Sequence, residues 1–184
     1  MLVLSGAAPF ENEETNVAAQ TVTGTETTVL QYLAFSLAGE IYAIPLLGVK
    51  EIIEYGGVTP IPTMPDFVRG VINLRGLVVP VLDLSARFGE GRTQIGERTC
   101  IIIIEQEGRD QDMGVVVDGV NAVIDVAPED IEPPPSFGAH LRVDFIQGMC
   151  KYQDRFVVVL GLAKVLSVDE ITQIADSLQE RDGP

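Results

Sequence analysis

The fold of this chain is decided by one stretch, Phe67-Val-Arg-Gly-Val-Ile-Asn-Leu-Arg-Gly-Leu-Val-Val-Pro-Val-Leu-Asp-Leu84. Two β-prone runs flank the turn-forming residues Asn73-Leu-Arg-Gly76, and this arrangement predicts a hairpin. The second run, Leu77–Leu84, is apolar over such a length that we expect it to be buried on both faces. The stretch therefore indicates β structure with a packed core.

The same order of residues recurs further along the chain. Residues 70–88 align without a gap on residues 148–166, and residues 42–49 align on residues 113–120. Any two Val-rich hairpins can resemble each other, so one match alone would carry little weight. Because the two matches occur in the same order, we interpret them as an internal duplication.

Three more hairpins are predicted around the first one, over residues 30–46, 100–117 and 148–162. Residues 47–53 fit either a short helical face or an irregular strand. A terminal helix is expected over Val168–Leu178, with Asp169 at its start. Each half then has about five short strands, too few to bury two faces unless the sheet curls closed. Two small barrels side by side, with a binding groove between them, are the expected all-β architecture.

Composition and charge exclude several classes of protein. The chain has 184 residues, of which 46% are hydrophobic, and a mean hydropathy of +0.26, which is incompatible with wholesale disorder. Its net charge of −15 disfavours nucleic acid and anionic membranes as partners, since both are bound through Lys and Arg. The acidic ends, residues 1–29 and 167–184, are expected to be a flexible leader and a terminal helix with an acidic tail.

Residues that could carry chemistry are scarce. Cys100 and Cys150 lie in apolar runs and are expected to be buried free thiols, with one disulfide as the alternative. His140 is the single histidine, which makes a zinc site improbable. No nucleotide or nucleophile motif is present, so we expect no enzyme, no metal and no cofactor. No signal peptide and no membrane-spanning run is found, so a cytoplasmic protein is expected.

Three segments resemble one known family. The stretch Phe67–Leu84 closely resembles the signature of CheW-type chemotaxis coupling proteins. Similar matches are Tyr42-Ala-Ile-Pro45 with Val49-Lys-Glu-Ile-Ile53, and Gly114-Val-Val-Val-Asp-Gly-Val120. The fit runs from about Gln31 to Leu166, and Asn-Leu-Arg-Gly before a Val-Val-Pro strand is its most specific part.

The resemblance implies a domain over residues 30–166 made of two intertwined, five-stranded SH3-like barrel subdomains, roughly 30–90 and 98–166, with short helices. It also implies a non-catalytic scaffold that links the cytoplasmic tip of membrane chemoreceptors to the regulatory domain of a CheA-type histidine kinase. Such a scaffold would be cytoplasmic and recruited to membrane-bound receptor arrays. The alternatives are the same role in a non-motility chemosensory pathway, or a small β-barrel enzyme.

A receptor-binding set follows from the family motif. An apolar groove that accepts a helix needs aliphatic anchors and a few charges that fix its register. Glu51 and Arg75 could pair with each other or with the partner, and both possibilities stay open. The expected receptor-facing residues are Val49, Glu51, Ile52, Gly70, Asn73, Leu74, Arg75 and Gly76.

One kinase-binding residue is expected from the same resemblance. Phe137 follows the proline run that begins at Pro133 and occupies the place where the family has an aromatic residue at the second-barrel interface. An exposed loop phenylalanine is a candidate interface anchor. The alternative is that Phe137 packs under its own loop as local core.

Overall fold

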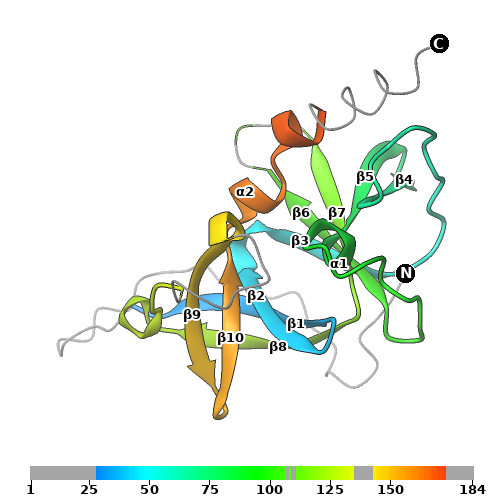
Figure 1. Cartoon of the computed structure of the whole chain (residues 1–184). Helices are drawn as coiled ribbons and strands as arrows, with labels where there is room; N and C mark the ends of the chain where they lie inside the picture. Colours follow the sequence, from blue (N-terminus) through cyan, green and yellow to red (C-terminus); the bar gives the residue numbers. More distant parts are fainter. Residues whose placement is uncertain (1–27, 107, 109–110, 135–142, 173–184) are drawn as a thin grey trace.

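The computed structural model describes residues 28–106, 108, 111–134 and 143–172, which form two five-stranded β-sheets (Figure 1). Sheet I has the strand order β8-β1-β2-β10-β9, and sheet II has the order β3-β6-β7-β5-β4. The all-β prediction is confirmed. The strands of the described residues are β1 (Leu30–Leu37), β2 (Glu40–Pro45), β3 (Val49–Glu54), β4 (Val68–Leu74), β5 (Leu77–Asp83), β6 (Cys100–Glu105), β7 (Asp112–Val117), β8 (Gly119–Val126), β9 (Ile146–Tyr152) and β10 (Arg155–Leu160). The short helices are α1 (Leu84–Arg87), α2 (Leu162–Val165) and the 3-10 turns η1 (Leu46–Gly48), η2 (Pro128–Asp130) and η3 (Val143–Phe145).

The two sheets exchange strands along the chain. After the β1–β2 hairpin the chain crosses to sheet II, where it forms β3 to β7, and it returns to sheet I with β8. β3 pairs with β6, and β8 pairs with β1, both antiparallel. Each sheet therefore has strands from both halves of the chain. Neither sheet corresponds to the range 30–90 or 98–166, because the pairing of β3 and β8 is non-local.

The structure contains the internal repeat. The β4–β5 hairpin with α1 and the β9–β10 hairpin with α2 match at an offset of 78 residues, from the first strand to the end of the helix. Isolated backbone bridges join Val71 to Thr59 and Met149 to Glu132, so both copies pair with a preceding segment at the same repeat position. These two coincidences support the duplication.

Two-residue turns close three of the hairpins. Both turn residues have positive φ angles at Ala38 and Gly39, at Arg75 and Gly76, and at Gln153 and Asp154. Positive φ at both positions defines a type I′ turn, whose twist matches that of the strands. The hairpin tips are thus set by local geometry.

Three apolar clusters hold the molecule together. One lies in sheet I around Tyr32, Ala43 and Val157, and a second lies in sheet II around Ile72, Val81 and Ile103. The third and largest, which we call the inter-sheet core, lies between the sheets. Its largest fully buried side chains are Phe35, Leu37, Ile44, Leu82, Leu84, Ile102, Ile104, Phe145 and Leu160. The groove expected between two barrels is therefore a packed core, in which truncating one of these side chains to alanine costs about 2–5 kcal/mol.

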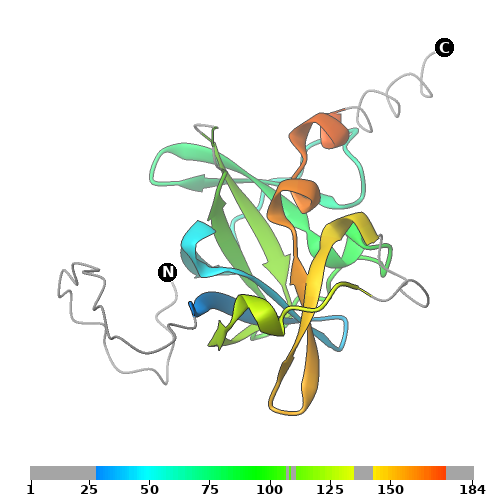
Figure 2. The ribbon, with the colours of Figure 1, turned by 90° about the vertical axis from the view of Figure 1, so that its left-hand side faces the viewer.

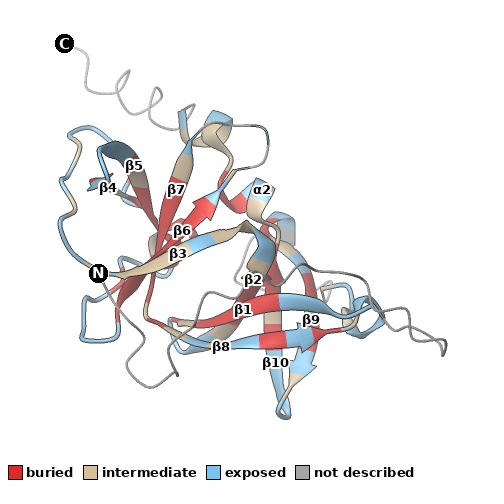
Figure 3. Cartoon of the chain, turned by 180° about the vertical axis from the view of Figure 1, so that it is seen from behind, coloured by how far each residue is buried: buried red, intermediate tan, exposed pale blue. Residues whose placement is uncertain are grey.

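The inter-sheet core explains the continuous apolar runs of the sequence. In β6, Ile101 and Ile103 face the core of sheet II, while Ile102 and Ile104 face the inter-sheet core. Both faces of the strand are buried, so its side chains do not alternate with polar residues. The buried residues of β6 and β7 lie along the middle of the molecule (Figure 3).

β5 departs from the expectation of burial on both faces. Its first residues, Leu77 and Val78, are 64% and 63% exposed, while Val81 and Leu82 are fully buried. The strand enters the core only beyond Val78, because its first residues extend to the hairpin tip. The ambiguous residues 47–53 form the end of η1 and the strand β3.

Arg87 joins the two repeats and the C-terminal segment. Its guanidinium carbon lies 4.7 Å from the ring centroid of Phe67 and 4.9 Å from that of Phe145, the same position in each repeat. Its Nη2 donates to Glu170 at 2.9 Å. The aromatic contacts and the ion pair offset the cost of burying this charge.

The C-terminal helix begins at Val168, as predicted, but its N-cap is a different residue. Residues 168–172 are helical, and the amide of Glu170 donates to the Ser167 hydroxyl at 3.4 Å, so Ser167 rather than Asp169 is the N-cap. Residues 173–178 of the expected helix lie outside the described residues, as do residues 1–27 of the leader expected over residues 1–29. Cys100 and Cys150 are free and buried, as expected.

Candidate functional site

The candidate receptor-binding residues gather where the two edge strands of sheet II approach each other. The tip of the β4–β5 hairpin reaches β3, and Arg75 donates two parallel hydrogen bonds to Glu51, with Nη1–Oε1 at 2.7 Å and Nη2–Oε2 at 3.0 Å. Arg69 lies over the ring of Tyr55, 5.8 Å from its centroid, at the other end of the same edge. These contacts curl the sheet so that its two edges meet.

The Glu51–Arg75 pair leaves its basic member open to solvent. The side chain of Arg75 is 75% exposed and that of Glu51 is 26% exposed. Hydrogen bonding to Glu51 raises the pKa of the Arg75 guanidinium. A guanidinium has five donors in a fixed plane, and the pair uses two of them. Arg75 can therefore donate hydrogen bonds to a second carboxylate while it stays bonded to Glu51.

Asn73 and Gly76 shape the tip that presents Arg75. The amide of Gly76 donates to Asn73 Oδ1 at 2.9 Å, within the two-residue turn. Gly76 has a φ of 86° and Arg75 a φ of 51°, so only one turn residue bears the strain of a side chain in the left-handed region. Their local role is to hold the tip in one conformation.

Gly70 is buried and has a packing role. Its φ is 140°, and a Cβ atom at this position would lie 2.0 Å from the carbonyl oxygen of Thr59. The Thr59–Val71 bridge requires this close approach of two backbones. Gly70 therefore supports the hairpin from beneath and is not available for direct contact with a partner.

The remaining predicted residues lie on different faces of sheet II. Val49 and Ile52 pack at the half-buried margin of the inter-sheet core, while Leu74 packs against the core of sheet II. Glu51, between Val49 and Ile52, points instead toward the hairpin tip and Arg75. The structure thus brings Glu51 and Arg75 together and separates them from Val49 and Ile52.

A shallow groove of about 200 Å³ lies beside this tip, and the family motif did not indicate it. Its lining residues are Lys50, Leu77, Val78, Val79, Glu105, Gln111 and Asp112. Lys50 Nζ donates to both carboxylate oxygens of Asp112, at 2.9 and 3.0 Å, and this bond raises the pKa of Lys50. Exposed Leu77 and Val78 supply its apolar wall. The sequence feature that could have indicated this groove is the position of Leu77 and Val78 directly after the turn.

A buried network fixes the base of the hairpin. Asp83 is fully buried and accepts from Arg69 Nε at 2.7 Å, from the Thr93 amide and hydroxyl at 2.9 Å each, and from the Ala86 amide at 3.2 Å. The repeat has Gly161 at the position of Asp83, so the first hairpin alone carries this anchor. The network holds β4, β5 and α1 in register beneath the tip.

Two searches of the described residues gave no site of another kind. No group of three or more His, Cys, Asp or Glu side chains in that part of the chain could hold a metal ion. None of the helices there has the length and apolar character needed to span a bilayer. Phe137 and His140 lie outside the described residues.

Two intertwined sheets with a shared core, and an exposed surface that combines aliphatic side chains with paired charges, define a β-sheet module for binding other proteins. The family model of the CheW-like domain matches residues 31–170, and the chain belongs to the CheW-like family. Its role is that of a coupling adaptor in chemotaxis signalling.

Known relatives agree with this assignment. The chemotaxis protein CheW of Klebsiella aerogenes is 36% identical over 149 residues, which cover 81% of this chain and 89% of that protein. Protein FrzA of Myxococcus xanthus is 33% identical over 108 residues, 59% of this chain and 66% of that protein. The crystal structure of the scaffolding protein TtCheW from Thermoanaerobacter tengcongensis matches with a TM-score of 0.68 and 34% identity, over 78% of this chain and 91% of that one.

Proposed function

We propose that this chain joins the cytoplasmic tip of a membrane chemoreceptor to a CheA-type histidine kinase, and that it does so without catalysing a reaction. The observation that carries the proposal is the edge of sheet II, where the exposed guanidinium of Arg75 stands beside exposed Leu77 and Val78. An α-helical hairpin such as a receptor tip binds through apolar anchors and a few charges that fix its register. This surface has both.

The proposed receptor contact has a charged part and an apolar part. Arg75, still paired with Glu51, takes a receptor carboxylate through its free donors, and Lys50 with Asp112 offers a second pair of charges nearby. The groove receives aliphatic side chains of the helix. The proposed contact residues are Val49, Lys50, Glu51, Ile52, Asn73, Leu74, Arg75, Gly76, Leu77, Val78 and Asp112, with Gly70 supporting them from within.

The kinase contact is proposed to lie on another part of the molecule. Phe137 remains the residue predicted from the family resemblance, and its substitution by serine is expected to weaken kinase binding without changing receptor binding. Contacts of this kind are individually weak and gain strength when they are repeated in a receptor array. We propose that the chain is recruited to such arrays at the membrane through its partners.

A second candidate is the same coupling role in a chemosensory pathway that does not control motility. The similarity to Protein FrzA, a relative whose name is not that of a chemotaxis protein, favours this possibility. The two candidates share the same binding surfaces and differ only in the identity of the receptor and the kinase.

Reconstitution of the complex tests the proposal. Membranes that contain the host chemoreceptor are sedimented with the kinase, in the presence or absence of this chain. The kinase is expected to sediment only when the chain is present. Sedimentation that is the same with and without the chain would contradict the coupling role.

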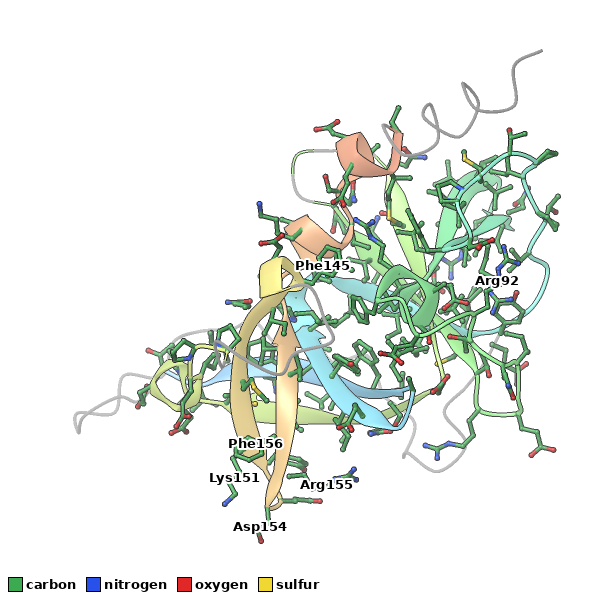
Figure 4. All side chains as sticks on the ribbon, viewed as in Figure 1. Arg92, Phe145, Lys151, Asp154, Arg155 and Phe156 are labelled. Atoms are coloured by element: carbon green, nitrogen blue, oxygen red, sulfur yellow. The ribbon has the colours of Figure 1, made fainter. Side chains whose placement is uncertain are left out.

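A matched pair of variants tests the surface. Arg75→Glu places a second acid beside Glu51 and is expected to weaken receptor binding by about tenfold or more. The control is Arg92→Glu, which changes the charge equally at an arginine whose side chain is 52% exposed, on the loop after α1 (Figure 4). Equal losses in the two variants would show that net charge, rather than the hairpin tip, determines binding.

A further inference from the structure

One buried cation lies at the junction between the two repeats. The side chain of Arg87, in α1 of the first repeat, is only 3% exposed, and its guanidinium lies against the rings of Phe67 and Phe145. Its Nε also donates to the carbonyl oxygen of Val165, at 3.4 Å. Phe145 and Val165 occupy the repeat positions of Phe67 and Arg87, so this one side chain contacts both copies at equivalent places.

The C-terminal helix supplies a counter-charge to this cation. Arg87 Nη2 donates to Glu170 Oε2 at 2.9 Å, and the side chain of Glu170 is 29% exposed. Removing the carboxylate from a buried ion pair is strongly destabilising, because the remaining charge is then uncompensated in a poorly hydrated site. The position of the C-terminal helix and the packing at the junction therefore depend on each other.

The C-terminal helix is shallowly buried. Its described part, residues 168–172, which we call the latch, packs half-buried Val168 and Ile171 at the margin of the inter-sheet core. Just before it, the side-chain amide of Gln106 donates to the carbonyl oxygen of Leu166 at 3.0 Å. Helices shorter than about 12–15 residues are marginal in water by themselves, so a short helix of this kind is held by its docking contacts. Elements with shallow burial open more readily than core strands.

The two repeats are anchored differently. In the first repeat, fully buried Asp83 binds Arg69 and the amide of Ala86, and so joins β5 to β4 and α1. The repeat positions of Asp83 and Arg69 are Gly161 and Gln147, so this buried ion pair has no counterpart in the second repeat. There, α2 leads directly into the latch. The first repeat thus has an anchor of its own, whereas the second depends on the latch.

The elements that the latch would hold lie together at one end of the β9–β10 hairpin. η3, α2 and the latch, drawn in yellow, orange and red, follow one another at the end opposite the hairpin turn in two perpendicular views (Figures 1 and 2). Figure 4 places Phe145 at this end and Asp154 at the other. The backbone joins the same elements, since the amide of Gly161 donates to the carbonyl oxygen of Phe145 at 2.9 Å.

We propose that the latch controls the second repeat: while it is docked, Glu170 neutralises Arg87 and fixes η3 and α2, and when it is released, these elements loosen while Asp83 keeps the first repeat closed. A consequence concerns the kinase contact and rests on the proposed function. Phe137 lies eight residues before Phe145 in the chain. Release of the latch is therefore expected to weaken kinase binding and to leave receptor binding at the β4–β5 hairpin unchanged.

Amide hydrogen exchange of the full chain, followed residue by residue by NMR, tests the latch. Glu170→Gln removes the charge and keeps the shape of the side chain. It is expected to speed exchange at the amides of Gly161 and Leu166 by about tenfold or more. The amide of Asp83, at the repeat position of Gly161, is expected to change by less than about twofold. Glu129→Gln, at an exposed acid of η2, is the matched control and should change none of these amides.

A second variant tests the partner of the latch. Arg87→Met replaces the cation by an apolar side chain of similar length, so the junction no longer needs a carboxylate. In this background, Glu170→Gln is expected to change the exchange of Gly161 by less than about twofold. An effect of Glu170→Gln that is as large with Met at position 87 as with Arg would show that Glu170 acts through another contact, and would overturn the inference.

The remaining outcomes separate the latch from the function on which its consequence rests. Equal acceleration at Gly161 and Asp83 in Glu170→Gln would mean a uniform loss of stability and would overturn the latch, as would no acceleration at either amide. Kinase binding that stays unchanged while Gly161 exchanges faster would overturn the control of the kinase contact. A wild-type chain that binds neither receptor nor kinase would instead overturn the proposed function, whereas the exchange measurement decides the latch by itself.

Discussion

Arg75 and Glu51 come from opposite edges of sheet II and meet through two parallel hydrogen bonds of 2.7 and 3.0 Å. The pair holds the tip of one edge hairpin against the other edge strand. It also fixes the plane of the Arg75 guanidinium, most of which faces solvent. One interaction can thus support the sheet and present a charge to a partner.

Exchanging the two charges separates these roles. The double variant Glu51→Arg, Arg75→Glu re-forms an ion pair between the strands, but its exposed member is then acidic. Receptor binding is expected to stay as weak as in Arg75→Glu, because the partner's carboxylate is repelled. The melting temperature is expected to stay within about 2 °C of the wild-type value, since exposed ion pairs add little stability. Recovery of binding in receptor co-sedimentation would assign the pair a purely internal role.

Gly70 is expected to tolerate no side chain. Gly70→Ala would bring Cβ to 2.0 Å from the Thr59 carbonyl oxygen in a backbone conformation that L residues rarely adopt. The free energy of unfolding is expected to fall by about 3 kcal/mol or more, measured by urea denaturation. Gly56→Ala is the control, because a Cβ there meets no atom within 4 Å. Equal stability of the two variants would mean that the Thr59–Val71 bridge can move aside.

Asp83 is expected to be the most sensitive polar position of the first hairpin. Asp83→Ala removes the acceptor of four hydrogen bonds and leaves the largely buried Arg69 guanidinium without its carboxylate. The expected loss is about 3–5 kcal/mol in the free energy of unfolding, measured by urea denaturation. Glu54→Ala, at an exposed carboxylate of β3, should change it by less than about 0.5 kcal/mol. A small effect of Asp83→Ala would show that the loop around Thr93 does not depend on this network.

Stability is expected to fall in alkaline solution through Tyr42. Burial raises the pKa of Tyr42 to about 12, and the charges of Glu40 and Glu90 act in the same direction. The folded state thus favours the neutral phenol, so the contribution is complete below about pH 10 and is lost as the pH rises toward 12. This contribution of Tyr42 to the free energy of unfolding amounts to about 2–3 kcal/mol.

Comparison with Tyr42→Phe isolates this effect from the titration of lysines. The difference in unfolding free energy between the wild type and Tyr42→Phe is expected to be constant from pH 7 to about pH 9.5 and to shift in favour of the variant above that. Chemical denaturation across this range measures it. A difference that stays constant up to pH 12 would contradict the assignment.

Short-range features could be predicted from the sequence, whereas the pairing of distant strands could not. The β4–β5 hairpin, its turn and the repeat at 148–166 follow from local patterns and from the family resemblance. The exchange of β3 and β8 between sheets does not, because a strand's own residues do not specify which of several apolar neighbours it joins. The expectation of two intertwined subdomains therefore did not say which strands join which sheet.

The candidate site was predictable in composition but not in geometry. Glu51 and Arg75 were both expected, yet a sequence contains no distance, so whether they pair stayed open until the structure brought them together. Gly70 was expected at the surface on the same motif, but it is buried, because the segment before β4 packs over it. Leu77 and Val78 were expected in the core, since apolar character alone does not show where a strand leaves it.

The crossing of β3 and β8 between the sheets makes the two halves of the chain mutually dependent. Each half supplies the edge strand that pairs with the central hairpin of the other half, β3 with β6 and β8 with β1. A fragment that ends between the halves would therefore lack a complete sheet. Loss of either half therefore disrupts both sheets at once.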